Sequence, residues 1–92
     1  MTLTVDSVAL RNIGFNTQEE RGVDSYHVQT EVSVRDEIVV RTLIARKGHV
    51  LDVRSTSVER DGPQDVDRVR RIAERQHCDV VSEVKRGRFD GV

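Results

Sequence analysis

Apolar and polar residues alternate along the chain between residues 25 and 58, a pattern typical of β-strands with one buried face. The alternation runs through 25–35 and 38–46. It continues in a third segment after the turn at Lys47-Gly48, where glycine tolerates a positive φ. These segments predict an antiparallel sheet with one apolar face. That core face is predicted to carry Tyr26, Val28, Val32, Val34, Ile38, Val40, Ile44, Leu51 and Val53.

The pairing of these strands follows from their faces, because a shift of one residue moves every side chain to the opposite face. A three-residue loop over 35–37 pairs Val34 with Ile38 and sets Glu31 opposite Arg41, a favourable cross-strand pair. A two-residue turn would send Ile38 to the polar side, so we favour the longer loop. For the next hairpin the same reasoning predicts the pairs Ile44–Leu51 and Thr42–Val53.

The first 24 residues carry weaker patterns. Residues 3–10 contain apolar side chains on both parities and are predicted to form a first strand, with a bulge near its middle. The polar segment 11–24 contains two glycines and is predicted to be a loop. Within it, Thr17 and Glu20 have the spacing of a capping box, which makes one helical turn plausible there and leaves open an ordered binding loop.

A single amphipathic helix is predicted over about 63–77. Pro63 suits the first position of a helix, and apolar residues recur at helical spacing after it. Residues 80–84 are predicted to be a last strand. The expected order is therefore β-β-β-β-α-β, in one α+β domain over 1–84, with the helix on the core face of the sheet. A polar, basic tail over 85–92 follows.

Composition limits the possible functions. Charged residues make up 34% of the chain, yet the net charge is only −1, which argues against binding polyanions through bulk charge. No segment approaches the roughly 20 apolar residues of a membrane span, and the first ten residues lack the pattern of a signal peptide. The single cysteine cannot form a disulfide within the chain. We therefore expect a cytoplasmic protein without membrane contact.

The second face of the predicted sheet carries an apolar patch near the Lys47-Gly48 end, and one helix cannot cover both faces. The first strand, a second copy of the chain or a different protein could cover it. We favour a second copy, and hence a homodimer. The predicted interface is Val39, Leu43, Ala45 and Val50.

Basic residues suggest a second possibility, a surface that tracks phosphates. Three arginines lie on the outer face of the predicted helix, three further basic residues lie in the tail, and Arg46 and Lys47 lie at the hairpin. The simpler interpretation is a solvated face on which Asp67 and Glu74 pair with Arg71. The candidate nucleic-acid contacts are Arg68, Arg71, Arg75, Lys85, Arg86 and Arg88.

Cys78 is the third candidate, as the centre of a thiol- or metal-dependent enzyme. With Glu74 and His77 it places a carboxylate, an imidazole and a thiol within about one helical turn. A zinc site needs more ligands than these neighbours supply, and the alternative is a small buried thiol where the helix meets the last strand. Phosphate-binding glycine loops and nucleophile elbows are absent from the sequence. We therefore expect a non-catalytic interaction or regulatory module without a metal or cofactor.

Overall fold

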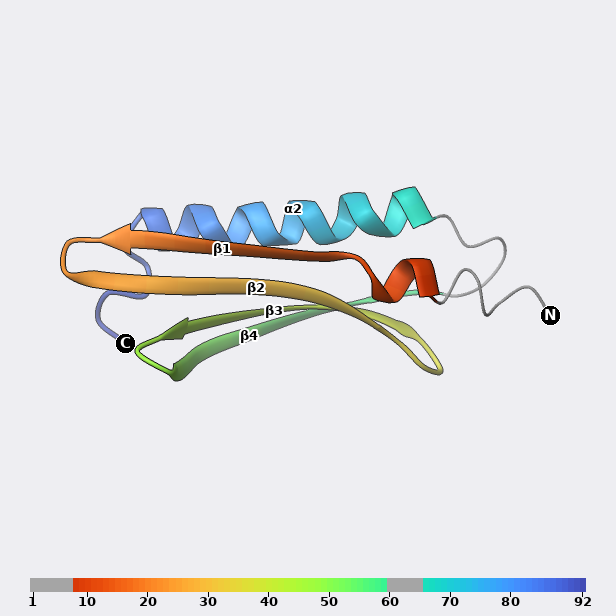
Figure 1. Ribbon diagram of the computed structural model, residues 1–92, viewed down its shortest axis with the longest axis horizontal. Coiled ribbons are helices and arrows are strands. Elements are labelled where there is room, and N and C mark those ends of the chain that lie inside the picture. The colour runs from red at the N-terminus through yellow and green to blue at the C-terminus, as the bar shows by residue number, and fades with distance from the viewer. Residues whose placement is uncertain (1–7, 60–65) are drawn as a thin grey trace.

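A computed structural model describes residues 8–59 and 66–92. The chain forms a four-stranded sheet followed by a long helix, arranged as in Figure 1. Neighbouring strands are antiparallel and follow the order of the chain, β1-β2-β3-β4. A short helix at 8–11 precedes the sheet. The predicted α+β class, with an antiparallel sheet and one amphipathic helix, is confirmed. The elements are β1 (Gly14–Arg21), β2 (Asp24–Val34), β3 (Ile38–Arg46), β4 (His49–Val58) and α2 (Val66–Lys85).

The hairpin between β2 and β3 has the predicted register. Val34 lies opposite Ile38 across a three-residue loop, and Glu31 lies opposite Arg41. The buried residues of both strands share the face that α2 covers. This hairpin could be predicted because the three-residue loop places Val32 and Val34 on the same side of the sheet as Ile38 and Val40, whereas a shift of one residue separates them.

The hairpin between β3 and β4 differs from the prediction by one residue. A bulge between Ile44 and Ala45 shifts the pairing, so that Ile44 lies opposite Asp52 and Leu43 opposite Val53. Leu51 is the extra residue. A bulge reverses the faces of the residues beyond it. Val53 therefore belongs to the second face of the sheet, and its predicted place on the core face is wrong.

The first 24 residues also differ from the prediction. Residues 8–10 of the predicted strand are helical, and residues 3–7 lie outside the described part of the chain. The predicted loop 11–24 is mostly β1, which pairs along its whole length with β2. The core-side residues of β1 are only half-buried and include charged side chains. The segment therefore lacks the alternation of apolar and polar residues that predicts a strand. A two-residue turn with Gly22 at φ 59° joins the two strands.

Helix α2 is longer than predicted. It continues to Lys85, so the predicted end at 76–78 and the predicted strand at 80–84 are both wrong; the predicted start at Pro63 lies outside the described residues. Val80 and Val84 are separated by one helical turn and both are completely buried, which extends the apolar stripe along the sheet. The buried residues of α2 are Val69, Ala73, His77, Val80 and Val84.

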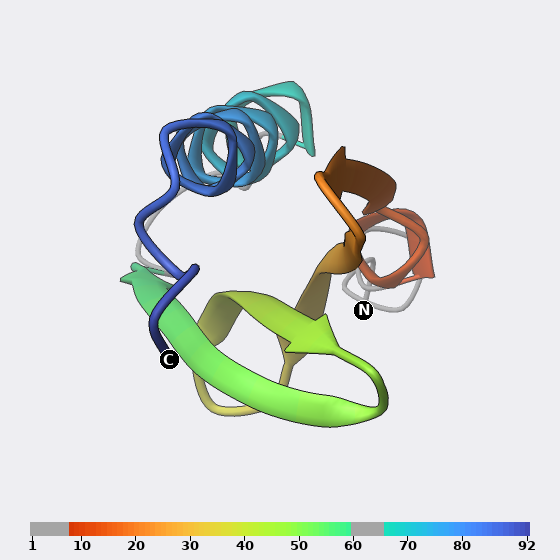
Figure 2. The same cartoon turned by 90° about the vertical axis from the view of Figure 1, so that its left-hand side faces the viewer.

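The core lies between α2 and the concave side of the curved sheet, which Figure 2 shows along the long axis. The helix packs on β1, β2 and β3. Leu10 and Ile13, from the first described segment, join this core and not the second face. Residues 86–90 turn back after α2 and insert Phe89 into the core between β2, β3 and the end of the helix.

Candidate functional site

The core is divided into two apolar clusters by a layer of hydrogen-bonded polar side chains, of which Thr30, Thr42 and His77 are buried. His77 of α2 is at the centre of this layer and is 5% exposed. Its Nε2 atom lies 2.8 Å from Thr17 Oγ1 on β1, and its Nδ1 atom lies 2.8 Å from Thr30 Oγ1 on β2. A neutral imidazole donates at one nitrogen and accepts at the other, and each hydroxyl can take the complementary role. Both ring nitrogens are therefore satisfied in the neutral form.

The layer continues across the sheet through Gln76. Thr30 Oγ1 lies 2.6 Å from Thr42 Oγ1 on β3, and the amide Nε2 of Gln76 donates to that Thr42 hydroxyl at 3.0 Å. The hydroxyl of Thr56 on β4 donates to Gln76 Oε1 at 2.5 Å. Each strand thus contributes one threonine to this layer. Thr17 and Thr30 contact His77, and Thr42 and Thr56 contact Gln76. Burial lowers the pKa of the His77 imidazole, so the neutral form is favoured in the folded protein.

A second polar cluster lies where the turn after α2 meets the ends of β1, β2 and β3. The guanidinium of Arg21 binds both carboxylate oxygens of Asp90, with Nη2 at 2.7 Å, and its Nη1 donates to the carbonyl of Lys85 at 2.6 Å. The buried Tyr26 hydroxyl donates to Asp90 Oδ1 at 2.9 Å. The hydrogen bond from Arg21, followed by that from Tyr26, lowers the pKa of Asp90.

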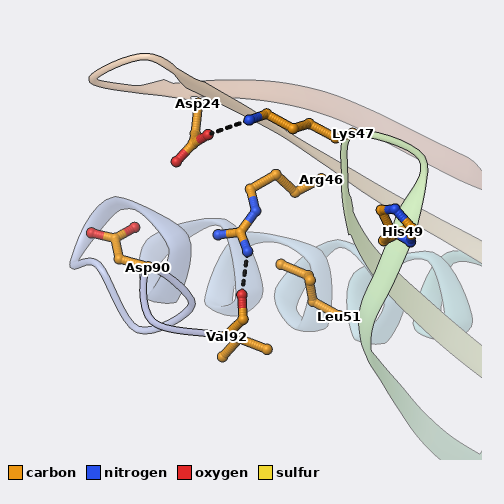
Figure 3. A pocket seen from close by; sticks show the side chains of 7 residues that line it. All are labelled: Asp24, Arg46, Lys47, His49, Leu51, Asp90 and Val92. Carbon is orange, nitrogen blue, oxygen red and sulfur yellow. Dashed lines mark hydrogen bonds and ion pairs between the residues drawn. The ribbon is translucent and has the colours of Figure 1, made fainter.

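Arg46 borders this cluster and an open pocket of about 470 Å³. Its Nη1 donates to the Tyr26 hydroxyl at 3.1 Å and to the Phe89 carbonyl at 3.3 Å, and its Nη2 donates to the Val92 carbonyl oxygen. The guanidinium carbon lies 5.5 Å from the centre of the Tyr26 ring. Figure 3 shows the Arg46 guanidinium among the lining side chains, with the Lys47 ammonium directed to Asp24 on one side. The pocket is lined by Asp24, Arg46, Lys47, His49, Leu51, Asp90 and Val92.

The second face of the sheet carries the predicted interface residues. Ala45 lies opposite Val50, and Leu43 lies opposite Val53, which the bulge adds to the patch. Val50 is 55% exposed and Val53 is 46% exposed. Val39 lies further along β3, opposite Ser57, and is half-buried. The patch is therefore formed by two adjacent strands, with Gln29 opposite Leu43 at its border on β2.

The predicted basic residues of the helix and the tail belong to one continuous element, because Lys85 ends α2 and Arg86 follows it directly. Arg71 and Arg75 are exposed, and neither forms an ion pair with another described residue. The expected pairing of Asp67 with Arg71 is wrong, since Asp67 contacts Arg70 at 3.4 Å.

Two charged contacts tie the end of α2 to its neighbours. Arg54 of β4 binds Glu83 with both Nη atoms, at 2.5 and 3.0 Å, and lowers the pKa of that carboxyl. Arg88 in the following turn contacts the same carboxylate at 3.2 Å. Arg88 is therefore partly neutralised and differs in this respect from Arg71 and Arg75. Arg54 itself lies on the helix side of the sheet, where the bulge places it.

Cys78 lies in the middle of α2 with its side chain exposed, so its predicted position at the helix end and the alternative of a buried thiol are both wrong. His77, its neighbour, points into the core towards β1 and β2. The adjacent imidazole and thiol thus face different environments. Among residues 8–59 and 66–92 no group of three or more His, Cys, Asp or Glu side chains is arranged to hold a metal ion.

Sequence reasoning missed the polar layer and the contacts that form the pocket. His77 falls on the apolar stripe of the helix, and a histidine at such a position is a signal that hydroxyl partners face it from the sheet. Arg46 directly precedes the Lys47-Gly48 turn, so its charge beside a tight turn was visible in the sequence. Its contacts with residues 89–92 were not, because they depend on how the chain turns after α2.

Comparison with known proteins finds no significant match of this chain to a protein-family model, a curated protein or a solved structure. Within the described part of the chain, neither helix has the length and apolar character needed to cross a membrane.

Proposed function

We propose that this protein is a non-catalytic interaction module that self-associates through the second face of its sheet. The observation that carries the proposal is the pair of apolar rows Leu43–Val53 and Ala45–Val50, on the side of the sheet opposite α2. Two valines of these rows are about half exposed. Apolar side chains grouped in this way on a sheet are typical of an interaction site.

A second copy of the chain fits this face in size. The longest strand of the sheet, β2, has 11 residues and extends about 37 Å, and four strands about 4.8 Å apart form a sheet roughly 15 to 20 Å wide. Its second face therefore has an outline of about 600 Å², at the lower end of the roughly 600 to 1,000 Å² that a stable interface buries on each partner. Two such sheets can pack face to face, as in a β-sandwich. The available surface is therefore sufficient for a dimer that uses most of this side.

A second copy also fits this face in charge. Glu31 and Arg41 lie opposite each other beside the patch, with 3.6 Å between their charged atoms. A surface with one acid and one base is complementary to itself, because a twofold axis can bring each carboxylate to the guanidinium of the other copy. A uniformly charged partner would meet repulsion from one of the two residues.

Light scattering at low micromolar concentration tests this proposal. We expect a dimer mass for the unchanged chain and a monomer mass for Leu43→Glu, because the new carboxylate would be buried without a partner. Such a charge raises a dissociation constant by about a hundredfold or more. Ser82→Glu, on the exposed face of α2, is the matched control and should remain dimeric.

Val53→Lys provides a second variant in case Leu43→Glu does not fold, since Val53 is more exposed. Circular dichroism of each variant establishes that the fold is intact. A folded chain that is monomeric at every concentration, or a folded Leu43→Glu protein that remains dimeric, contradicts self-association through this face.

A second candidate function is binding of nucleic acid by the outer face of α2. The continuous helix favours it, because Arg68, Arg71 and Arg75 recur at helical spacing over about 10 Å of α2, and Arg86 directly follows the end of the same helix. Arg88 would contribute less because of its contact with Glu83. We expect binding that falls steeply with salt and is lost when Arg71 and Arg75 are both changed to Glu. Binding that is independent of salt, or no binding at low salt, contradicts this function.

A further inference from the structure

The pocket at the Lys47-Gly48 end of the sheet has two cationic side chains on its border, Arg46 at the end of β3 and Lys47 in the turn. Arg46 is held in place from three sides by the Tyr26 ring, the Tyr26 hydroxyl and two backbone carbonyls. A charged group that is fixed in this way has little conformational entropy to lose when a ligand binds. This pocket is separate from the apolar patch and from the outer face of α2.

Arg46 retains donors that the protein does not use. A guanidinium has five N–H groups, and the hydrogen bonds described for Arg46 involve two from Nη1 and one from Nη2. Within the described part of the chain, no acceptor contacts its Nε–H. The Nε and Nη2 atoms form one edge of the guanidinium, and such an edge binds two oxygens of a phosphate or carboxylate side by side. Of this edge, only Nη2 is occupied, by the Val92 carbonyl.

Lys47 also has donors to offer. Its Nζ atom lies 3.8 Å from Asp24 Oδ1, which is too long for a hydrogen bond, and its side chain is 76% exposed. The other carboxylate of the pocket, Asp90, is engaged by Arg21 and Tyr26. Two cations with unused donors thus border a pocket in which one of the two aspartate side chains, Asp90, is already paired.

The backbone of Lys47 is an independent observation. Its φ is +53°, and among the described residues it is the only one other than glycine with a positive φ. A two-residue hairpin turn of this kind favours asparagine or glycine, because a lysine side chain strains the left-handed conformation. Strain of this type is often retained where the side chain has a function.

We propose that this pocket binds the phosphate group of a small phosphorylated molecule, with the Nε–Nη2 edge of Arg46 and the ammonium of Lys47 as its contacts. A phosphate dianion offers oxygens to both cations. Its binding energy to a guanidinium and an ammonium together exceeds that of a monoanion, because it carries more negative charge. The pocket volume of about 470 Å³ leaves space for an organic group, and Leu51 provides an apolar wall for it. Val92 would give up its hydrogen bond to Arg46 when the ligand enters.

The test is a titration of the full chain with phenyl phosphate at constant ionic strength, followed by the amide NMR signals. We expect saturable shifts confined to the pocket, around residues 46–51 and 89–92. Lys47→Asn should weaken binding by about tenfold through loss of one charged contact, and should also raise the melting temperature, because asparagine adopts a positive φ more easily. Arg71→Gln, a loss of charge on the outer face of α2, should change neither quantity.

Each alternative outcome overturns part of the proposal. Shifts that rise linearly without saturation, or equal weakening by Lys47→Asn and Arg71→Gln, would show only a general response to anions. Benzoate that binds as tightly as phenyl phosphate would replace the phosphate assignment by a carboxylate site. Lys47→Asn that binds as the unchanged chain does removes Lys47 from the contacts. Because Lys47→Asn relieves strain, loss of the fold does not confound the result.

Discussion

The Nδ1 atom of His77 lies 2.8 Å from the hydroxyl oxygen of Thr30, and both residues are buried between α2 and the sheet. This contact and the matching one to Thr17 align the helix against β1 and β2 at a single position. An apolar stripe alone allows a helix to slide along a sheet, whereas buried hydrogen bonds are satisfied in one register only. The polar layer therefore specifies how α2 is seated.

Stability should depend on pH through His77. Its pKa is lowered in the folded state, so the unfolded chain binds more protons below its ordinary pKa of about 6.5. The contribution of His77 is thus complete above that pH and is lost as the pH falls towards the lower, folded-state pKa. Urea unfolding should show a free energy that decreases in this window by at most about 1.4 kcal/mol per pH unit for this group.

His77→Gln should flatten this part of the pH profile, while His49→Gln, at an exposed position, should leave it in place. The His77→Gln protein will be less stable at neutral pH, so the slope and not the absolute free energy is the quantity to compare. An unchanged slope in His77→Gln would assign the pH dependence to another group.

Tyr26→Phe should lower the free energy of unfolding by about 1 kcal/mol. The substitution keeps the buried ring and removes the hydroxyl that donates to Asp90 and accepts from Arg46. Asp90 retains Arg21 as a partner, which limits the loss. Chemical unfolding measures the effect, and a loss of several kcal/mol would mean that the hydroxyl organises the whole cluster.

Ser82→Pro tests the continuity of α2 through the segment in which a strand was predicted. Ser82 is exposed, so its replacement does not disturb the packing of the core. Proline in a helix interior lowers the free energy of unfolding by about 3 kcal/mol or more. Ser82→Ala is the matched control and should change stability by less than about 0.5 kcal/mol. Thermal unfolding with circular dichroism distinguishes the two. Equal stability of both variants would contradict a helix at this position.

Cys78 should react with a thiol reagent in the native protein, without prior unfolding, because its side chain is exposed on α2. Cys78→Ser should change the free energy of unfolding by less than about 0.5 kcal/mol, as is usual for surface substitutions. Mass spectrometry of the alkylated, folded chain measures the reaction. Protection until denaturant is added would show that the thiol is covered, for instance by another copy of the chain.

The N-terminal strand shows why part of the fold was not predictable from the pattern. The core side of β1 carries Phe15 and Thr17 but also Glu19 and Arg21, so its alternation has little apolar contrast. Arg21 is accommodated on this side because Asp90, far away in sequence, lies opposite it. A charged residue was thus placed by a tertiary contact that local sequence does not contain.

Local periodicity of valine and isoleucine was sufficient to predict the β2–β3 hairpin, the face that becomes the core and the existence of one amphipathic helix. The end of α2 and the bulge at Leu51 depend on contacts between segments distant in the chain. Val80, Val81 and Val84 suit a strand in local propensity, and packing of Val80 and Val84 against Tyr26 and Ile44 makes them helical. The bulge places Val53 on the second face, opposite Leu43, and Arg54 on the helix side, where it binds Glu83. Both contacts join residues that are distant in the chain, so the local pattern does not contain them.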